Sequence, residues 1–111
     1  MKKALLIFLL FSTPASAQIL KETTSEAVKF AGSGGRTAGA AYYCKMDEEA
    51  LDEFIGMAHG RMSNLAADKV DKVVAQLEFS NNFSAWSSRP PPDGCEAFIA
   101  ELTREFPKIF K

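Results

Sequence analysis

The chain has few of the residue types that carry metal-dependent or redox chemistry. Its 111 residues include one histidine and two cysteines, and the cysteines stand far apart, at Cys44 and Cys95. A structural zinc site needs four sulfur or nitrogen ligands, and a redox enzyme favours a Cys-x-x-Cys pair. We therefore expect no bound metal, no cofactor and no catalytic set, and we interpret the protein as a non-enzyme.

The sequence also lacks a basic block and an apolar run long enough to cross a membrane. Lysine and arginine number 13 against 14 aspartates and glutamates, which makes nucleic acid and anionic membrane surfaces poor candidate partners. The apolar run at residues 4–11 is too short, because a membrane-spanning helix needs about 20 residues. We expect no membrane span in the mature protein.

The N-terminal segment has the pattern of a secretory signal peptide. Lys2 and Lys3 precede the apolar run, and a proline and the small-residue triplet ASA follow it. We expect cleavage after Ala17, which would place the mature chain, residues 18–111, in the periplasm or outside the cell.

Residues 18–43 are predicted to contain a short helix and then a linker. The stretch TTSEAVKF has a cap and apolar residues suited to a helix, whereas the following AGSGGRTAGAA contains four glycines within eight residues. Because glycine loses much backbone entropy on folding, this composition favours a flexible segment.

Residues 44–111 are predicted to form an all-α domain: a bundle of three main helices, or four, cross-linked by one disulfide. Asp47 caps the first helix, a break at residues 63–67 separates helices at 47–65 and 67–80, and Asp93 with Glu96 matches a capping box for the last. The predicted apolar stripes are Leu51, Phe54, Ile55, Ala58, Met62 and Leu65; Val70, Val73, Val74 and Leu77; and Cys95, Phe98, Ile99, Leu102 and Phe106. Pro107 ends the last helix, and Ile109 and Phe110 are expected to fold back onto the core.

Cys44 and Cys95 are expected to form a structural disulfide, because a signal peptide directs the chain to an oxidising compartment. The bond would tie the starts of two helices together in an up-down-up arrangement. The chain-entropy model assigns a loop of this length about 4 kcal/mol of stabilisation.

The segment FSNNFSAWSSRPPPDG is predicted to be a loop and the best candidate for a protein-binding surface. Aromatic side chains and polyproline segments both recur at recognition sites. The alternative is that Phe83 and Trp86 cover the open end of a small core. The candidate residues are Phe79, Phe83, Trp86, Arg89, Pro90, Pro91 and Pro92.

Two other features of the 47–65 helix have structural explanations. His59 has no recognisable nucleophile beside it, so we interpret it as a packed or surface histidine. Gly56 and Gly60 share one face of the helix, and this spacing predicts close approach of another helix within the monomer.

These observations favour a small periplasmic or secreted protein that binds another protein of the cell envelope, as an adaptor or accessory factor, through the aromatic loop or a helix face. A second hypothesis comes from the overall plan: a signal peptide, a small helical chain and one disulfide across about fifty residues resemble the HdeA-type acid-stress chaperones. That resemblance implies partial unfolding in acid and binding to apolar surface on client proteins. A third hypothesis is a small enzyme or an enzyme inhibitor with a rigid, exposed Trp86.

Overall fold

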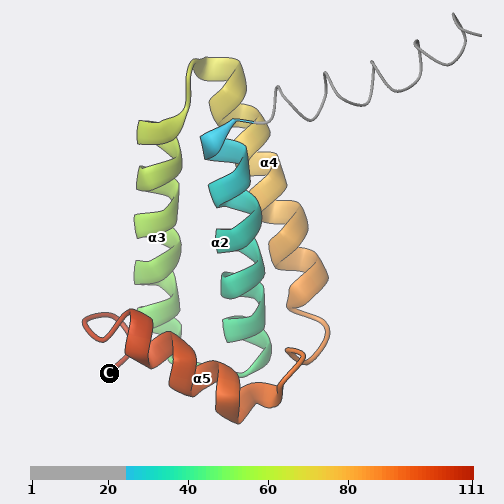
Figure 1. The fold of residues 1–111 in the computed structure, drawn as a ribbon, viewed down its shortest axis with the longest axis vertical. Coiled ribbons are helices and arrows are strands. Elements are labelled where there is room, and N and C mark those ends of the chain that lie inside the picture. The colour runs from blue at the N-terminus through green and yellow to red at the C-terminus, as the bar shows by residue number, and fades with distance from the viewer. Residues whose placement is uncertain (1–24) are drawn as a thin grey trace, which may run out of the picture.

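The computed structural model describes residues 25–111, so the predicted signal peptide and its cleavage site lie outside the described residues (Figure 1). The described part of the chain is a small all-α bundle without strands, as the sequence predicted. Its helices are α2 (Glu26–Tyr43), α3 (Glu48–Leu65), α4 (Lys69–Trp86) and α5 (Gly94–Glu105).

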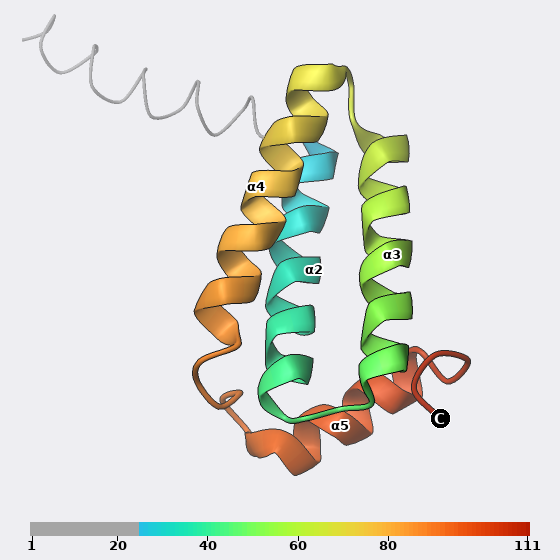
Figure 2. The ribbon, with the colours of Figure 1, turned by 180° about the vertical axis from the view of Figure 1, so that it is seen from behind.

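Helix α2 is the central element of the bundle. Figures 1 and 2 show it between α3 and α4 from both sides, and α5 lies across the base. Helices α3 and α4 run in opposite directions, as predicted, but α5 crosses beneath them instead of running up alongside. The up-down-up prediction therefore holds for two of its three helices.

The prediction of a flexible linker at residues 31–41 is wrong, because these residues belong to α2 and most of them are buried. Each glycine inside a helix costs about 1 kcal/mol relative to alanine. The missing side chains allow α4 to approach closely: a Cβ on Gly39 would lie 2.6 Å from the carbonyl oxygen of Phe83, and one on Gly35 would overlap the carbonyl of Phe79. The folded unit thus includes α2 and does not begin at Cys44.

Helices α3 and α4 are separate, which confirms the predicted break. The Asp47 carboxylate accepts a hydrogen bond from the Ala50 N–H at 2.9 Å and caps α3, and Asp68 caps α4 through the Asp71 N–H at 2.8 Å. Between the helices, the Ala67 N–H donates to the Asp71 carboxylate at 2.9 Å.

Helix α4 continues through SNNFSAW to Trp86, so the prediction of a loop from residue 80 is wrong. The Asn82 amide donates to the Glu78 carbonyl at 2.9 Å and to the Glu78 carboxylate at 3.0 Å, which satisfies the asparagine inside the helix. The last two turns pack against the glycines of α2, and this tertiary contact outweighs the low helix propensity of the segment.

The core is built largely from alanine and a few large side chains. Four residues of the predicted α3 stripe are buried, whereas Ile55 is half-buried and Leu65 is 40% exposed. The buried apolar cluster comprises Ala27, Ala31, Ala38, Ala41, Leu51, Phe54, Ala58, Met62, Ala75, Phe79, Leu102 and Phe110. The predicted tail contact is present, because the Phe110 ring lies 5.8 Å from that of Phe54.

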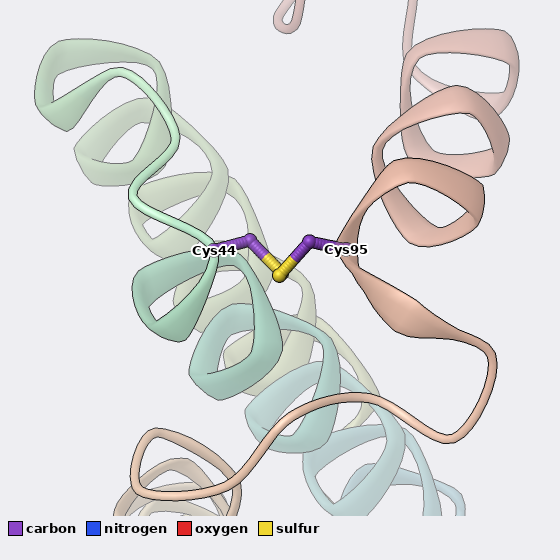
Figure 3. The surroundings of a disulfide bond; sticks show 2 residues. All are labelled: Cys44 and Cys95. Carbon is purple, nitrogen blue, oxygen red and sulfur yellow. A yellow bond between two sulfur atoms is a disulfide. The ribbon is translucent and has the colours of Figure 1, made fainter.

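Cys44 and Cys95 form the predicted disulfide, with 5.5 Å between their Cα atoms (Figure 3). Cys44 is the C-terminal cap of α2, and Cys95 lies in the first turn of α5. The bond therefore joins the end of one helix to the start of another, and not two helix starts as predicted. The capping box is also absent: the Asp93 side chain makes no capping hydrogen bond, and the Gly94 N–H donates to the Pro91 carbonyl at 3.0 Å.

Candidate protein-binding surfaces

The candidate residues from the sequence occupy three different environments. Phe79 and Pro91 are buried, Phe83 and Trp86 are half-buried on α4, and the remaining three follow the helix and are exposed. The exposed residues are Arg89, Pro90 and Pro92. The structure therefore does not gather the predicted set into one exposed loop.

Phe79 belongs to the core. Its ring packs on Gly34, where an added Cβ would lie 3.3 Å from the ring edge, and its centroid lies 4.8 Å from that of His59 on α3. His59 is half-buried in this contact. Phe79 thus holds the three long helices together and is not available to a partner.

Trp86 forms a cluster with two arginines, which we call the Arg–Trp–Arg cluster (Arg36, Trp86 and Arg89). The guanidinium carbon of Arg36 lies 5.6 Å from the centroid of the indole, and that of Arg89 lies 4.5 Å from it. Both distances are within the range of cation–π attraction. Sequence reasoning missed Arg36, because it assigned that residue to a linker. If the glycines of residues 32–39 had been interpreted as the face of a helix that packs on α4, Arg36 would have been predicted to lie next to α4.

The backbone that carries Arg89 is constrained on both sides. Three prolines follow it and fix their own φ angles, and the middle one, Pro91, is buried. Gly94 adopts a φ of 90°, which glycine tolerates, and Cys95 is tied to α2 by the disulfide. Arg89 therefore projects from a stiff segment.

A second surface lies on the opposite side of α4. We call it the outer stripe (Val70, Val73, Val74 and Leu77). The prediction that these residues form a core face is wrong, because they are 71%, 52%, 45% and 59% exposed. Ala75 and Phe79 are buried instead, and at 100° per residue they lie on the other side of the helix. Helix α4 thus has two apolar faces, and the described chain covers only one.

A lysine borders the outer stripe on one side. Lys69 precedes Val73 by one helical turn, so it lies on the side of α4 next to Val73. It is exposed. The charge at this border of the stripe is therefore positive.

The hollow beside His59 does not resemble an active site. It lies between α3 and α4 and is lined, among the described residues, by apolar and hydroxyl side chains without a carboxylate to orient the imidazole. Its lining residues are Ile55, His59, Phe79, Ser80, Phe83 and Ser84.

Two further findings concern membrane spans and metal sites within the described residues. No helix in the described range is long and apolar enough to cross a membrane, and residues 25–111 contain no group of three histidine, cysteine, aspartate or glutamate side chains placed to hold a metal ion. Comparison with protein-family models, with curated protein sequences and with solved structures gives no match to this chain.

Proposed function

We propose that this protein is a non-enzymatic binding factor of the cell envelope that holds an α-helix of a partner protein against the outer stripe of α4. The observation that supports this proposal is the exposure of three valines and a leucine on a helix whose opposite face already packs in the core. The signal-peptide pattern of residues 1–17 supports the envelope location.

The spacing of the outer stripe suits a helical partner. Apolar residues at positions i, i+3, i+4 and i+7 form the kind of ridge that packs into the groove of another helix. Burying a fully exposed valine or leucine side chain is worth about 1.5–3 kcal/mol, and these side chains, which are 45–71% exposed, would gain roughly half of that each. The partner helix would carry a matching apolar stripe, with aspartate or glutamate at the edge that faces Lys69.

Site-specific crosslinking in envelope extract tests this proposal. A photoreactive residue at Leu77 should crosslink one protein at neutral pH, and the crosslinked site should map to an apolar helix segment of that protein. The same residue at exposed Glu101 on α5 is the control position. The substitution pair Val73→Ser and Val74→Ser should abolish the crosslink, whereas Gln76→Ser, at an exposed position of the same helix outside the stripe, should retain it.

The proposal fails if Leu77 and Glu101 give the same products, or if the Val73→Ser, Val74→Ser pair leaves the crosslink intact. Because these valines are exposed, their substitution should not unfold the protein, and circular dichroism verifies that each variant is folded.

The acid-stress chaperone is the second candidate, and the same stripe favours it, because the folded protein already offers apolar surface to unfolded clients. This alternative requires suppression of client aggregation at pH 3, together with loss of near-ultraviolet circular dichroism of the protein itself. Light scattering from an acid-unfolded client, at pH 3 and pH 7, separates the two candidates. The dedicated binding factor should show no suppression at either pH.

A further inference from the structure

We propose that the Arg–Trp–Arg cluster is a receptor for a carboxylate-rich peptide segment, with a carboxylate bound by Arg36 and Arg89 and the peptide chain resting on the Trp86 indole. The cluster lies on the side of α4 that faces α2, away from the outer stripe. A binding role for this cluster therefore goes beyond the proposed function of the outer stripe, and the two surfaces can be tested separately.

The fold brings the three residues together through a single close contact. Gly39 faces the end of α4 so closely that a Cβ there would lie 2.9 Å from the Cβ of Trp86. Arg36 stands three residues earlier on α2, almost one turn away, and its guanidinium therefore reaches the indole. Arg89 approaches the same ring from the proline segment.

The positive charge of the cluster has no carboxylate partner in the described part of the chain. Both ion pairs within residues 25–111, Lys29–Glu26 and Arg104–Glu101, involve other residues. Each guanidinium lies over the indole, whose negative face attracts it, but the ring does not neutralise the charge. A carboxylate that accepts hydrogen bonds from both groups would neutralise part of that charge, and arginine suits such recognition through its planar array of donors.

The chemistry of the cluster favours a peptide over other anionic partners. Nucleic acid and anionic membranes are bound by surfaces with several cations, whereas this cluster has two and the whole chain carries a formal charge of −1. Tryptophan and arginine are the residues most enriched among energetic hot spots of protein interfaces. The prolines after Arg89 already restrict the backbone of this segment, so less conformational entropy is lost when a peptide binds.

The experiment uses the intrinsic fluorescence of Trp86, which is the only tryptophan of the chain and so reports on the cluster directly. The oxidised protein is titrated with a six-glutamate peptide, and a six-glutamine peptide serves as the uncharged control. The glutamate peptide should produce a saturable change in emission, and binding should weaken as salt is raised from 50 to 500 mM because the contacts are ionic.

Arginine variants identify the residues responsible. Arg36→Gln and Arg89→Gln should each raise the Kd by up to about fivefold, which is the upper end of the range for an exposed ion pair. Arg61→Gln is the matched control, because Arg61 also lies over an aromatic ring, at 5.6 Å from the centroid of Phe30, and it should leave the Kd unchanged. All three arginines are exposed, so these variants should remain folded.

Several outcomes would overturn the proposal. One is a fluorescence response that is absent, or that the glutamine peptide reproduces. Another is an unchanged Kd when Arg36 and Arg89 are both replaced by glutamine. Tighter binding of inorganic phosphate or of phosphatidylglycerol vesicles would assign the cluster to a phosphate or a lipid surface instead. Substitution of Val73 and Val74 should not affect the titration, so failure of the outer-stripe proposal would leave this result unchanged.

Discussion

Gly39 on α2 lies directly against the backbone of Phe83 on α4, since a Cβ on Gly39 would be 2.6 Å from the Phe83 carbonyl oxygen. Gly35 meets the carbonyl of Phe79 in the same way, one turn earlier. Two glycines on one side of α2 thus set the separation of the two helices. They also fix the position of Trp86, and with it the Arg–Trp–Arg cluster.

Gly39→Ala should destabilise the protein by about 1–3 kcal/mol, even though alanine is the better helix former, because the added methyl group meets backbone atoms that cannot move independently. Gly60→Ala on α3 is the matched control: apart from its chain neighbours and the local backbone of α3, no atom lies within 4 Å of its added Cβ, and it should stabilise the protein by about 0.5–1 kcal/mol. Urea unfolding measures both changes. Equal effects of the two substitutions would contradict the close contact between α2 and α4.

The glycines explain which parts of the fold the sequence could predict. Helix α3 was predicted correctly, because Asp47 is a clear cap and the residues from Leu51 to Met62 keep one period. Helix α2 was missed because backbone entropy argues against glycine in a helix, while the packing it permits depends on a partner distant in sequence. The spacing of Gly56 and Gly60 gave the opposite error: it predicted close approach of another helix, but no atom of another helix lies within 4 Å of a Cβ added at either position.

The candidate surfaces were predictable only in part. Periodicity correctly placed the outer-stripe residues on one face of a helix. It does not show whether another element covers that face, so the stripe was mistaken for part of the core. Trp86 and Arg89 lie close together in the sequence and were both among the predicted candidates, whereas Arg36 joins them only through tertiary contact. The site therefore depends on the α2–α4 contact, which no local pattern records.

Leucine-to-alanine substitutions should show which apolar stripe is core. Leu51 is 5% exposed and Leu77 is 59% exposed. Leu51→Ala should cost about 2–5 kcal/mol, because it leaves a cavity, and Leu77→Ala should change stability by less than about 0.5 kcal/mol. Thermal or urea unfolding of the two variants provides the comparison. A large loss from Leu77→Ala would mean that the outer stripe is covered in the isolated protein.

Loss of the disulfide should cost about 4 kcal/mol, which is the chain-entropy value for cysteines 51 residues apart. This is a large part of the 5–15 kcal/mol that stabilises a typical domain. Urea unfolding of the oxidised protein, with and without reductant, measures the difference. A variant with Cys44→Ser and Cys95→Ser should match the reduced protein and should not respond to reductant; equal stability of this variant and the oxidised protein would contradict the prediction.

Protonation of the Asp71 carboxylate in acid should lower the stability of the folded protein. The Ala67 N–H, and to a smaller extent the Ser25 hydroxyl, donate to its carboxylate and lower the pKa of Asp71 in the folded state. The stabilisation is therefore present at neutral pH and is lost as the pH falls below the ordinary aspartate range, about 4, through the folded-state pKa. Wild-type and Asp71→Asn proteins should differ more in stability at pH 7 than at pH 3.

Urea unfolding at the two pH values tests the effect of Asp71, with Asp52→Asn as a measure of the general effect of removing one exposed carboxylate. A difference between wild type and Asp71→Asn that is the same at both pH values would rule out this role for Asp71.

The disulfide closes a covalent ring that contains α3 and α4 but leaves α2 outside, because α2 ends at Tyr43 and the ring begins at Cys44. A protease that cuts once between residues 45 and 94 would leave a nicked but still single molecule, which separates only under reducing conditions. A cut within residues 26–43 would instead release part of the central helix, since only packing retains it. The disulfide thus keeps the fragments of α3 or α4 joined to the molecule after a single cut. A fragment cut from α2 is held only by its noncovalent contacts with α3 and α4.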